Sequence, residues 1–160
     1  MIGETQFRTA TASDLPDVLQ IAEESPFAPQ WPAAQFRQML DEQHPDANLR
    51  RCVLVAVSAT HVVGFAVGLL LCAVSPPEAE LESIVVSQLF RGKGIGKALI
   101  DAVIAWALDG KADRLRLEVR VGNSAALRLY TRHGFASVGK RPRYYTQPEE
   151  DALCLERTLP

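Results

Sequence analysis

A glycine-rich basic turn between an apolar strand and an amphipathic helix is the segment of this sequence best suited to bind a ligand. It reads Arg-Gly-Lys-Gly-Ile-Gly-Lys over residues 91–97. Its three glycines have no Cβ, so the backbone can turn sharply and approach a ligand closely. The helix that follows presents free N–H groups and the positive end of its dipole, and the turn adds three cations. These features predict a site for a polyanion.

Two common phosphate-binding motifs do not fit this turn. A Walker A loop requires G-x-x-x-x-G-K-[ST], but the span from Gly92 to Gly96 is one residue short and Ala98 replaces the hydroxyl that would bind magnesium. A dinucleotide fingerprint requires G-x-G-x-x-G on the first βα turn, with an acid after the next strand. Here the turn lies late in the chain, and the next strand continues into Arg120-Val-Gly-Asn123. An ATPase and a nicotinamide-binding protein are therefore both disfavoured.

Composition predicts one domain over residues 1–160 without a nucleic-acid or membrane partner. The chain is 48% hydrophobic and 22% charged, as in ordinary globular proteins. A net charge of −2 disfavours a protein that coats nucleic acid. The start of the sequence has no signal-peptide pattern, and the most apolar window, residues 62–74, is too short to span a bilayer. We therefore expect a cytoplasmic protein.

Three widely spaced cysteines, Cys52, Cys72 and Cys154, each lie in an apolar run typical of a strand. An odd number without C-x-x-C spacing favours buried, reduced thiols over disulfides or a zinc site. We therefore predict a reducing compartment and no metal.

Apolar periodicity predicts the element order β-α-α-β-β-β-α-β-α-β-β. The expected strands are 6–9, 52–57, 62–71, 81–86, 114–120, 135–145 and 152–158, and the expected helices are 15–24, 33–40, 95–108 and 125–132. Strands joined by hairpins pair antiparallel, whereas the strand-turn-helix-strand unit over 81–119 requires a parallel pair with a crossover helix. A single sheet of mixed direction follows.

Two later segments extend a resemblance that begins in the turn. The turn is similar to the R/Q-x-x-G-x-G/A pyrophosphate signature of the GNAT family of N-acetyltransferases. Residues 117–130, Leu-Glu-Val-Arg-Val-Gly-Asn-Ser-Ala-Ala-Leu-Arg-Leu-Tyr, together with Gly134-Phe135, resemble the family's N-x-x-A-x-x-L-Y-x-x-x-G-F block. The resemblance covers essentially the whole chain. It implies an α/β (α+β) GNAT fold: a single mixed, mostly antiparallel sheet with a central parallel pair splayed at the acetyl-coenzyme A site, and helices on both faces.

The same resemblance implies acetyl-coenzyme A as co-substrate and no metal. Its pyrophosphate would take backbone N–H groups of the turn, and the strand over 81–86 would bind the pantetheine arm, with an N–H near Val86 facing the thioester carbonyl. Asn123 would hydrogen-bond the pantetheine. The implied cofactor residues are Ile84, Val85, Val86, Arg91, Gly92, Lys93, Gly94, Ile95, Gly96, Lys97, Asn123 and Tyr130.

Acetyl transfer to an amine requires a neutral amine and a proton for the departing thiolate. The resemblance assigns Glu118, on the outward face of the strand 114–120, as the base and Tyr130 as the acid. Glu118 can instead be a surface partner of Arg116 or Arg120, and Tyr130 a core residue. Glu80 and Glu82 are a second pair of candidate bases. No histidine or cysteine has a recognisable triad spacing, so direct transfer in a ternary complex is expected.

Three stretches resemble the subfamily that acetylates the N-terminal alanine of a ribosomal protein: residues 79–81, residues 117–123, and the tail over 141–153. A peptide acceptor would lie between two aromatic flanks, Phe27 with Trp31 and Tyr144 with Tyr145, next to Glu80 and Glu82. Small amines, lysines and other N-termini remain alternative acceptors. A non-catalytic acyl-coenzyme A sensor remains an alternative from a different functional class.

Overall fold

Seven strands form one mixed sheet in the computed structural model, which describes residues 4–41, 43 and 48–160. The strands are β1 (Thr5–Thr9), β2 (Leu49–Ser58), β3 (His61–Leu71), β4 (Glu78–Val86), β5 (Arg114–Arg120), β6 (Ala136–Thr146) and β7 (Glu149–Thr158). Their order across the sheet is β1-β2-β3-β4-β5-β7-β6, and every neighbouring pair is antiparallel except β4 and β5. The predicted element order and the mixed sheet are confirmed.

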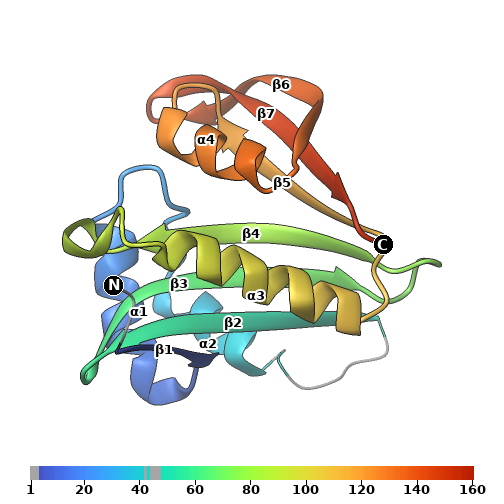
Figure 1. Cartoon of the computed structure of the whole chain (residues 1–160). Coiled ribbons are helices and arrows are strands. Elements are labelled where there is room, and N and C mark those ends of the chain that lie inside the picture. Colours follow the sequence, from blue (N-terminus) through green and yellow to red (C-terminus); the bar gives the residue numbers. More distant parts are fainter. Residues whose placement is uncertain (1–3, 42, 44–47) are drawn as a thin grey trace.

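Helices cover both faces of the sheet (Figure 1). The helices are α1 (Leu15–Glu23), α2 (Ala33–Asp41), α3 (Ile95–Asp109) and α4 (Ser124–Arg132), with short 3₁₀ turns η1 (Ala12–Asp14) and η2 (Gln88–Phe90). The residues of α1 and α2 pack with one cluster of buried side chains, and those of α3 and α4 pack with a second cluster on the other face. The sheet therefore lies between two cores, as expected for the predicted fold.

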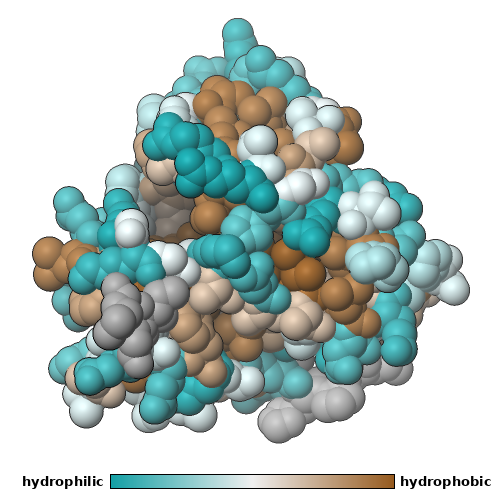
Figure 2. All heavy atoms as spheres, in the orientation of Figure 1, coloured by the Kyte–Doolittle hydropathy of each residue, from teal (hydrophilic) through white to brown (hydrophobic). Residues whose placement is uncertain are grey.

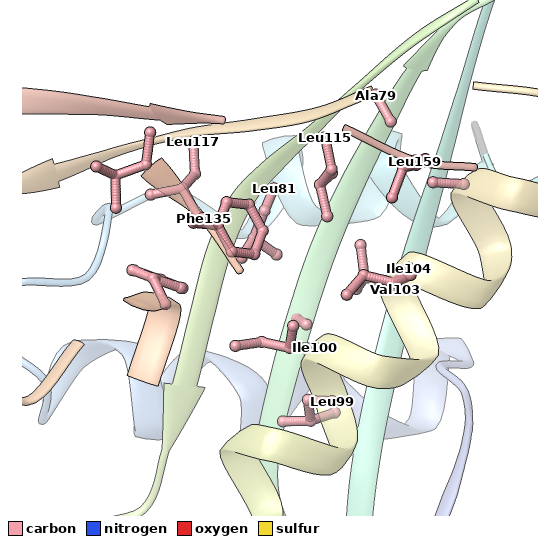
Figure 3. Close-up of a cluster of buried hydrophobic side chains, with 14 of the residues drawn as sticks. Ala79, Leu81, Leu99, Ile100, Val103, Ile104, Leu115, Leu117, Phe135 and Leu159 are labelled. Atoms are coloured by element: carbon pink, nitrogen blue, oxygen red, sulfur yellow. The ribbon is translucent and has the colours of Figure 1, made fainter. Parts of the chain in front are cut away.

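The larger core lies between α3 and the centre of the sheet (Figure 3). The stripe of α3 that it buries consists of Leu99, Ile100, Val103, Ile104 and Ala107. Trp106, which the periodicity places in this stripe, is only half-buried, and the Arg50 guanidinium lies 5.9 Å from its ring centre. Packing of α3 against β2, β3 and β4 holds the glycine turn at the end of β4.

Three strands begin three residues earlier than the sequence predicts. β2 begins at Leu49 rather than at residue 52. β4 begins at Glu78 rather than at residue 81, which places Glu80 as well as Glu82 inside the strand. β7 begins at Glu149 rather than at residue 152, so only Gln147 and Pro148 separate it from β6. The segments added to β4 and β7 are rich in glutamate, which has low strand propensity, but pairing with the neighbouring strand outweighs that preference.

All three cysteines are free, but only Cys52 is fully buried. Burial raises the pKa of the Cys52 thiol to about 12. Cys72 and Cys154 are half-buried, so the expectation that all three are buried is wrong for these two. Among the described residues, no helix is long and apolar enough to cross a lipid bilayer.

Candidate active site

The glycine turn begins directly after β4 and η2 and leads into α3. Gly92 and Gly94 have φ of 74° and 84°, in the left-handed region where a Cβ is strained. The Arg91 side chain folds back and donates from Nε to the Val86 carbonyl over 3.0 Å, which fixes the turn to the end of the strand. In the described part of the chain, no hydrogen bond occupies the backbone N–H groups of residues 92–97. The turn therefore presents a row of free donors at a helix N-terminus.

The parallel pair of strands separates soon after it forms. β4 and β5 are paired only at Ala79–Leu115 and Glu80–Arg116. Beyond Glu80, β5 leads away from β4 toward α4, β6 and β7 (Figure 1). Among the described residues, no strand pairs with the backbone edge of β4 that follows on this side. This is the splayed pair that the resemblance implied.

A β-bulge in β4 accompanies this separation. Ser83 pairs with Val67 and Leu81 with Gly68, so Glu82 has no partner in β3. Leu81 packs in the α3 core, and Ile84 packs against that core as well, although an unbroken strand would place them on opposite faces. Because of the bulge, Val85 lies on the same face as Glu80 and Glu82, which is the face covered by α1 and α2.

The space between the separated strands is a cleft of about 1870 Å³. Figure 2 shows this face of the molecule hollowed, with apolar residues in the recess. The cleft collects nearly every residue selected from the sequence. Its lining includes Phe27, Trp31, Glu80, Glu82, Ile84, Val85, Val86, Arg91, Gly92, Gly94, Ile95, Gly96, Lys97, Glu118, Asn123, Tyr130, Tyr144 and Tyr145. Lys93 is the exception, because its ammonium lies 5.1 Å from the ring centre of Phe90 and it does not line the cleft.

The turn and the open edge of β4 suit a long ligand with a phosphate-rich end. The Ser87 N–H donates to Val63 of β3 over 2.8 Å. Because N–H groups alternate in direction along a strand, those of Ile84 and Val86 face the cleft instead. A pyrophosphate at the turn and an extended chain along β4 would find donors at both places. Lys97 lines the same end and is held by Asp101 at 2.8 Å.

Glu118 lies on β5 in the part of the cleft lined by Tyr144 and forms an ion pair that the sequence did not indicate. Its Oε1 lies 3.0 Å from the Arg141 Nε of β6. The Tyr144 hydroxyl also hydrogen-bonds the Glu118 carboxylate, which is the main reason that the pKa of Tyr144 is raised. The alternative partners Arg116 and Arg120 pair with other carboxylates. Glu118 is therefore held in a fixed position at the cleft wall.

Glu80 and Glu82 differ in environment although they are only two residues apart. Glu82 accepts two hydrogen bonds from Arg51, at 2.8 and 3.2 Å. Glu80 has no ion pair within the described residues, and its pKa is raised by burial first and then by the charges of Glu82 and Glu118. Glu80 thus holds its proton more readily than an ordinary glutamate does, and it remains a second candidate base.

We expect Glu80→Gln to stabilise the protein at about pH 7.5. A raised pKa means that Glu80 binds its proton more tightly in the folded chain than in the unfolded chain. The protonated Glu80 side chain therefore stabilises the wild-type fold at low pH, and this contribution is lost as the pH rises through the folded pKa. The ionised carboxylate then opposes folding, and the amide does not. Thermal unfolding should show a higher Tm for the variant near neutral pH and a gain that disappears toward about pH 4. Glu149→Gln, at an exposed position, is the control; a lower Tm for Glu80→Gln at both pH values would contradict the assignment.

Tyr130 and Asn123 both lie at the α4 side of the cleft. The Tyr130 ring is buried edge-on against Phe135, with ring centres 5.7 Å apart, and burial raises the pKa of its hydroxyl well above the usual range. No other described residue hydrogen-bonds that hydroxyl. Asn123 caps α4, because its Oδ1 accepts from the Ala126 N–H at 3.3 Å. Its amide NH₂ remains available to a ligand.

The two aromatic flanks differ in how firmly they are held. Trp31 packs on the α1–α2 core and meets Phe36 edge-on at 5.5 Å, whereas Phe27 is 48% exposed. On the other flank, Tyr144 and Tyr145 meet edge-on at 5.0 Å. Trp31 therefore has a structural role besides the predicted one.

Several residues of the cleft were missed from the sequence. Alternation along β5 predicts an outward position for Arg120, but its side chain is buried between the two aromatic flanks. Arg128 and Arg132 also line the cleft, on one side of α4. Their i, i+4 spacing places both arginines on one face of α4 and could have been noticed in the sequence. The burial of Arg120 has no comparable signal in the neighbouring sequence.

The cleft, the turn and the splayed strands are those of an acetyltransferase, and the chain belongs to the Acetyltransferase (GNAT) family, whose sequence model matches residues 15–135. It is thus an acyltransferase that uses acetyl-coenzyme A. Within this family it is similar to N-alpha-acetyltransferase RimI of Mycobacterium tuberculosis, 36% identical over 79% of this chain and 75% of that protein. It is also similar to a putative [ribosomal protein bS18]-alanine N-acetyltransferase of Bacillus subtilis, 31% identical over 95% of this chain and 94% of that protein.

Two further comparisons complete this placement. The crystal structure of Ard1 from Thermoplasma volcanium is 28% identical, has a TM-score of 0.83 and is matched over 98% of this chain and 99% of that one. An uncharacterized protein of Mycobacterium leprae is 37% identical over 79% of this chain, which spans only 33% of that protein. The family model therefore covers residues 15–135, and the similarity to RimI-like relatives extends over as much as 95% of the chain.

Proposed function

We propose that this chain transfers the acetyl group of acetyl-coenzyme A to the N-terminal alanine amine of a ribosomal protein. The observation that carries the proposal is that one cleft joins the glycine turn, the splayed strands and the Glu118 and Tyr130 side chains. The name of the B. subtilis relative supports this acceptor, and the name of the M. tuberculosis relative supports an N-terminal α-amine. Residues 1–160 act as one catalytic domain, and the reducing cytoplasm suits its three free thiols.

Glu118 serves as the base that prepares the amine. An α-amine has a pKa of about 8, so roughly a tenth is neutral at pH 7, whereas a lysine amine near 10.4 is hardly neutral. Glu118 is held by Arg141 and Tyr144 where the strands diverge, and it takes the proton of the amine through a water molecule. The neutral amine then attacks the thioester carbonyl directly, without a covalent enzyme intermediate.

Two further groups act on the thioester. The Val86 N–H, which faces the cleft, donates to the carbonyl oxygen as negative charge develops on it. The Tyr130 hydroxyl, at the opposite wall, donates its proton to the departing thiolate. Asn123 and the free N–H groups of residues 92–97 bind the pantetheine and the pyrophosphate. The cofactor therefore lies along β4 with its reactive end toward the aromatic flanks.

A panel of amines tests this function. The protein is incubated with acetyl-coenzyme A and peptides that begin with alanine or another residue, N-blocked lysine peptides, or small amines, with thiol release and mass spectrometry as readouts. We expect the α-amine of alanine peptides to be acetylated best, above all one with a ribosomal-protein N-terminus. If lysine peptides or small amines are acetylated best instead, the proposed N-terminal alanine acceptor is wrong. Binding of acetyl-coenzyme A without thiol release for any amine would instead indicate the sensor.

A further inference from the structure

Arg120 is a buried cation in the acceptor side of the cleft. Its side chain is only 9% exposed, and its Nε has no hydrogen-bond partner in the described part of the protein. Burying a guanidinium is costly unless its charge and its donors are matched. The groups around Arg120 therefore have to match its charge and its donors.

Aromatic rings and carbonyl groups compensate the Arg120 charge. Its guanidinium carbon lies 4.2 Å from the ring centre of Tyr145 and 5.6 Å from that of Phe27. Its Nη1 donates to the Pro148 carbonyl at 2.9 Å, and its Nη2 donates to the Gln147 carbonyl at 3.4 Å. Arg120 therefore joins the segment that follows α1 to the β6–β7 hairpin, which lies on the other side of the cleft.

Phe27 depends on this contact more than its neighbours in the sequence do. Ala28 and Trp31 pack against the α1–α2 core, whereas Phe27 belongs to neither core cluster of the described residues. Gln30 holds the surrounding backbone by donating to the carbonyls of Ala22 and Ala28, at 2.7 and 3.0 Å. These bonds fix the loop but not the Phe27 ring, which lies against Arg120.

One carboxylate links the same cluster to the cofactor side. Glu150 lies 3.3 Å from the Arg120 Nη1 and accepts the Gly122 N–H at 2.6 Å. Gly122 precedes Asn123, the N-cap of α4, and α4 carries Tyr130. The Arg120–Glu150 pair thus connects both walls of the acceptor side with the helix of the proposed acid.

We propose that Arg120 is a positioning residue for the amine acceptor: stacked between Phe27 and Tyr145, it fixes the separation of the two walls between which the acceptor binds. The inference rests on the proposed function for the nature of the acceptor. Arg120 need not contact the acceptor itself, since its side chain is covered. Without it, the Phe27 ring and the hairpin would have to be ordered by the acceptor, at a cost in affinity.

The test compares Arg120→Met, Arg120→Lys and Phe27→Leu with Arg116→Met, a control on the exposed side of the same strand. We expect Arg120→Met to raise the KM for the best peptide about tenfold, equivalent to about 1.4 kcal/mol. The Kd for acetyl-coenzyme A and kcat should change less than about twofold, because Glu150 still accepts the Gly122 N–H when its partner Arg120 is removed. Arg120→Lys should give an intermediate KM, because it keeps the charge without the planar stack. The Phe27→Leu/Arg120→Met double variant should have the same acceptor KM as Arg120→Met alone, since both changes remove the same Phe27–Arg120 contact.

Amide hydrogen exchange tests the same inference without any acceptor. Exchange over residues 25–32 and 144–148 should speed up in Arg120→Met and in Phe27→Leu but not in Arg116→Met. Phe27→Leu alters an exposed ring, so it decides the outcome if Arg120→Met does not fold. Unchanged exchange in these segments would overturn the inference, and so would an unchanged acceptor KM in an active variant. If the wild-type protein acetylates no amine, the proposed function fails, and the exchange result alone decides the role of Arg120.

Discussion

Replacing Tyr130 by phenylalanine will lower kcat on the order of 100-fold, the lower end of what a positioned general acid contributes. The change removes one oxygen and keeps the buried ring against Phe135. No other described residue hydrogen-bonds the Tyr130 hydroxyl, so the variant breaks no bond within that part of the protein. Its high pKa, caused by burial, keeps the hydroxyl protonated at every pH at which the enzyme is studied. The loss should therefore be nearly the same across the pH range.

Steady-state kinetics with saturating peptide, together with calorimetric titration of acetyl-coenzyme A, check this prediction. The Kd for the cofactor should stay within about twofold and the Tm should not fall, because packing and buried surface are preserved. A Tyr130→Phe enzyme with unchanged turnover would show that the thiolate leaves without this proton. A large loss of cofactor affinity would instead make Tyr130 a binding residue.

Changing Glu118 to glutamine will lower kcat/KM by about 100-fold at pH 7, as expected for loss of a general base. The amide keeps the shape of the side chain and an oxygen that accepts the Tyr144 hydroxyl. It cannot take a proton from the amine. Since the amine loses its own proton near pH 8, the defect should shrink as the pH rises toward about 9. The pH profile of kcat/KM measures this directly.

Two comparisons separate proton transfer from the loss of an ion pair. Arg141→Met removes the partner 3.0 Å from Glu118 and leaves the carboxylate in place, so we expect a loss of only a few fold. A loss equal to that of Glu118→Gln would assign the effect to the ion pair. Glu80→Gln should cost less than Glu118→Gln; if it costs more, Glu80 is the base, and its raised pKa would then set the acidic limb of the profile.

The glycine turn and its helix were predictable because the interactions that form them are local. Glycines in left-handed conformation, a helix N-terminus and cations within seven residues define the predicted anion site wherever the segment lies in the fold. The alternation of β5 and the cap of α4 by Asn123 are local as well. The order of strands and helices could therefore be predicted from the sequence. The family could be predicted as well, from the turn and the Asn123–Tyr130 block.

The arrangement of charges in the cleft was decided by contacts between segments far apart in the sequence. Glu118 meets Arg141, Glu82 meets Arg51, and neither pairing follows from spacing along the chain. Glu80 is left without an ion pair among the described residues because the bulge at Glu82 and the short β4–β5 pairing set its surroundings. A pKa depends on burial and on neighbouring charges, so it is a property of the tertiary structure.

The sequence by itself determined the fold class, the acetyl-coenzyme A signature and the residues of the proposed chemistry, since these depend on residue type and short-range spacing. Only the tertiary structure decided that Arg120 is buried and that Phe27 and Tyr145 lie on either side of it. Alternation along β5 predicts an outward position for Arg120, but the β6–β7 hairpin and the segment after α1 close over it. The burial of a residue depends on every segment that packs around it, so it cannot be predicted from the sequence of one strand.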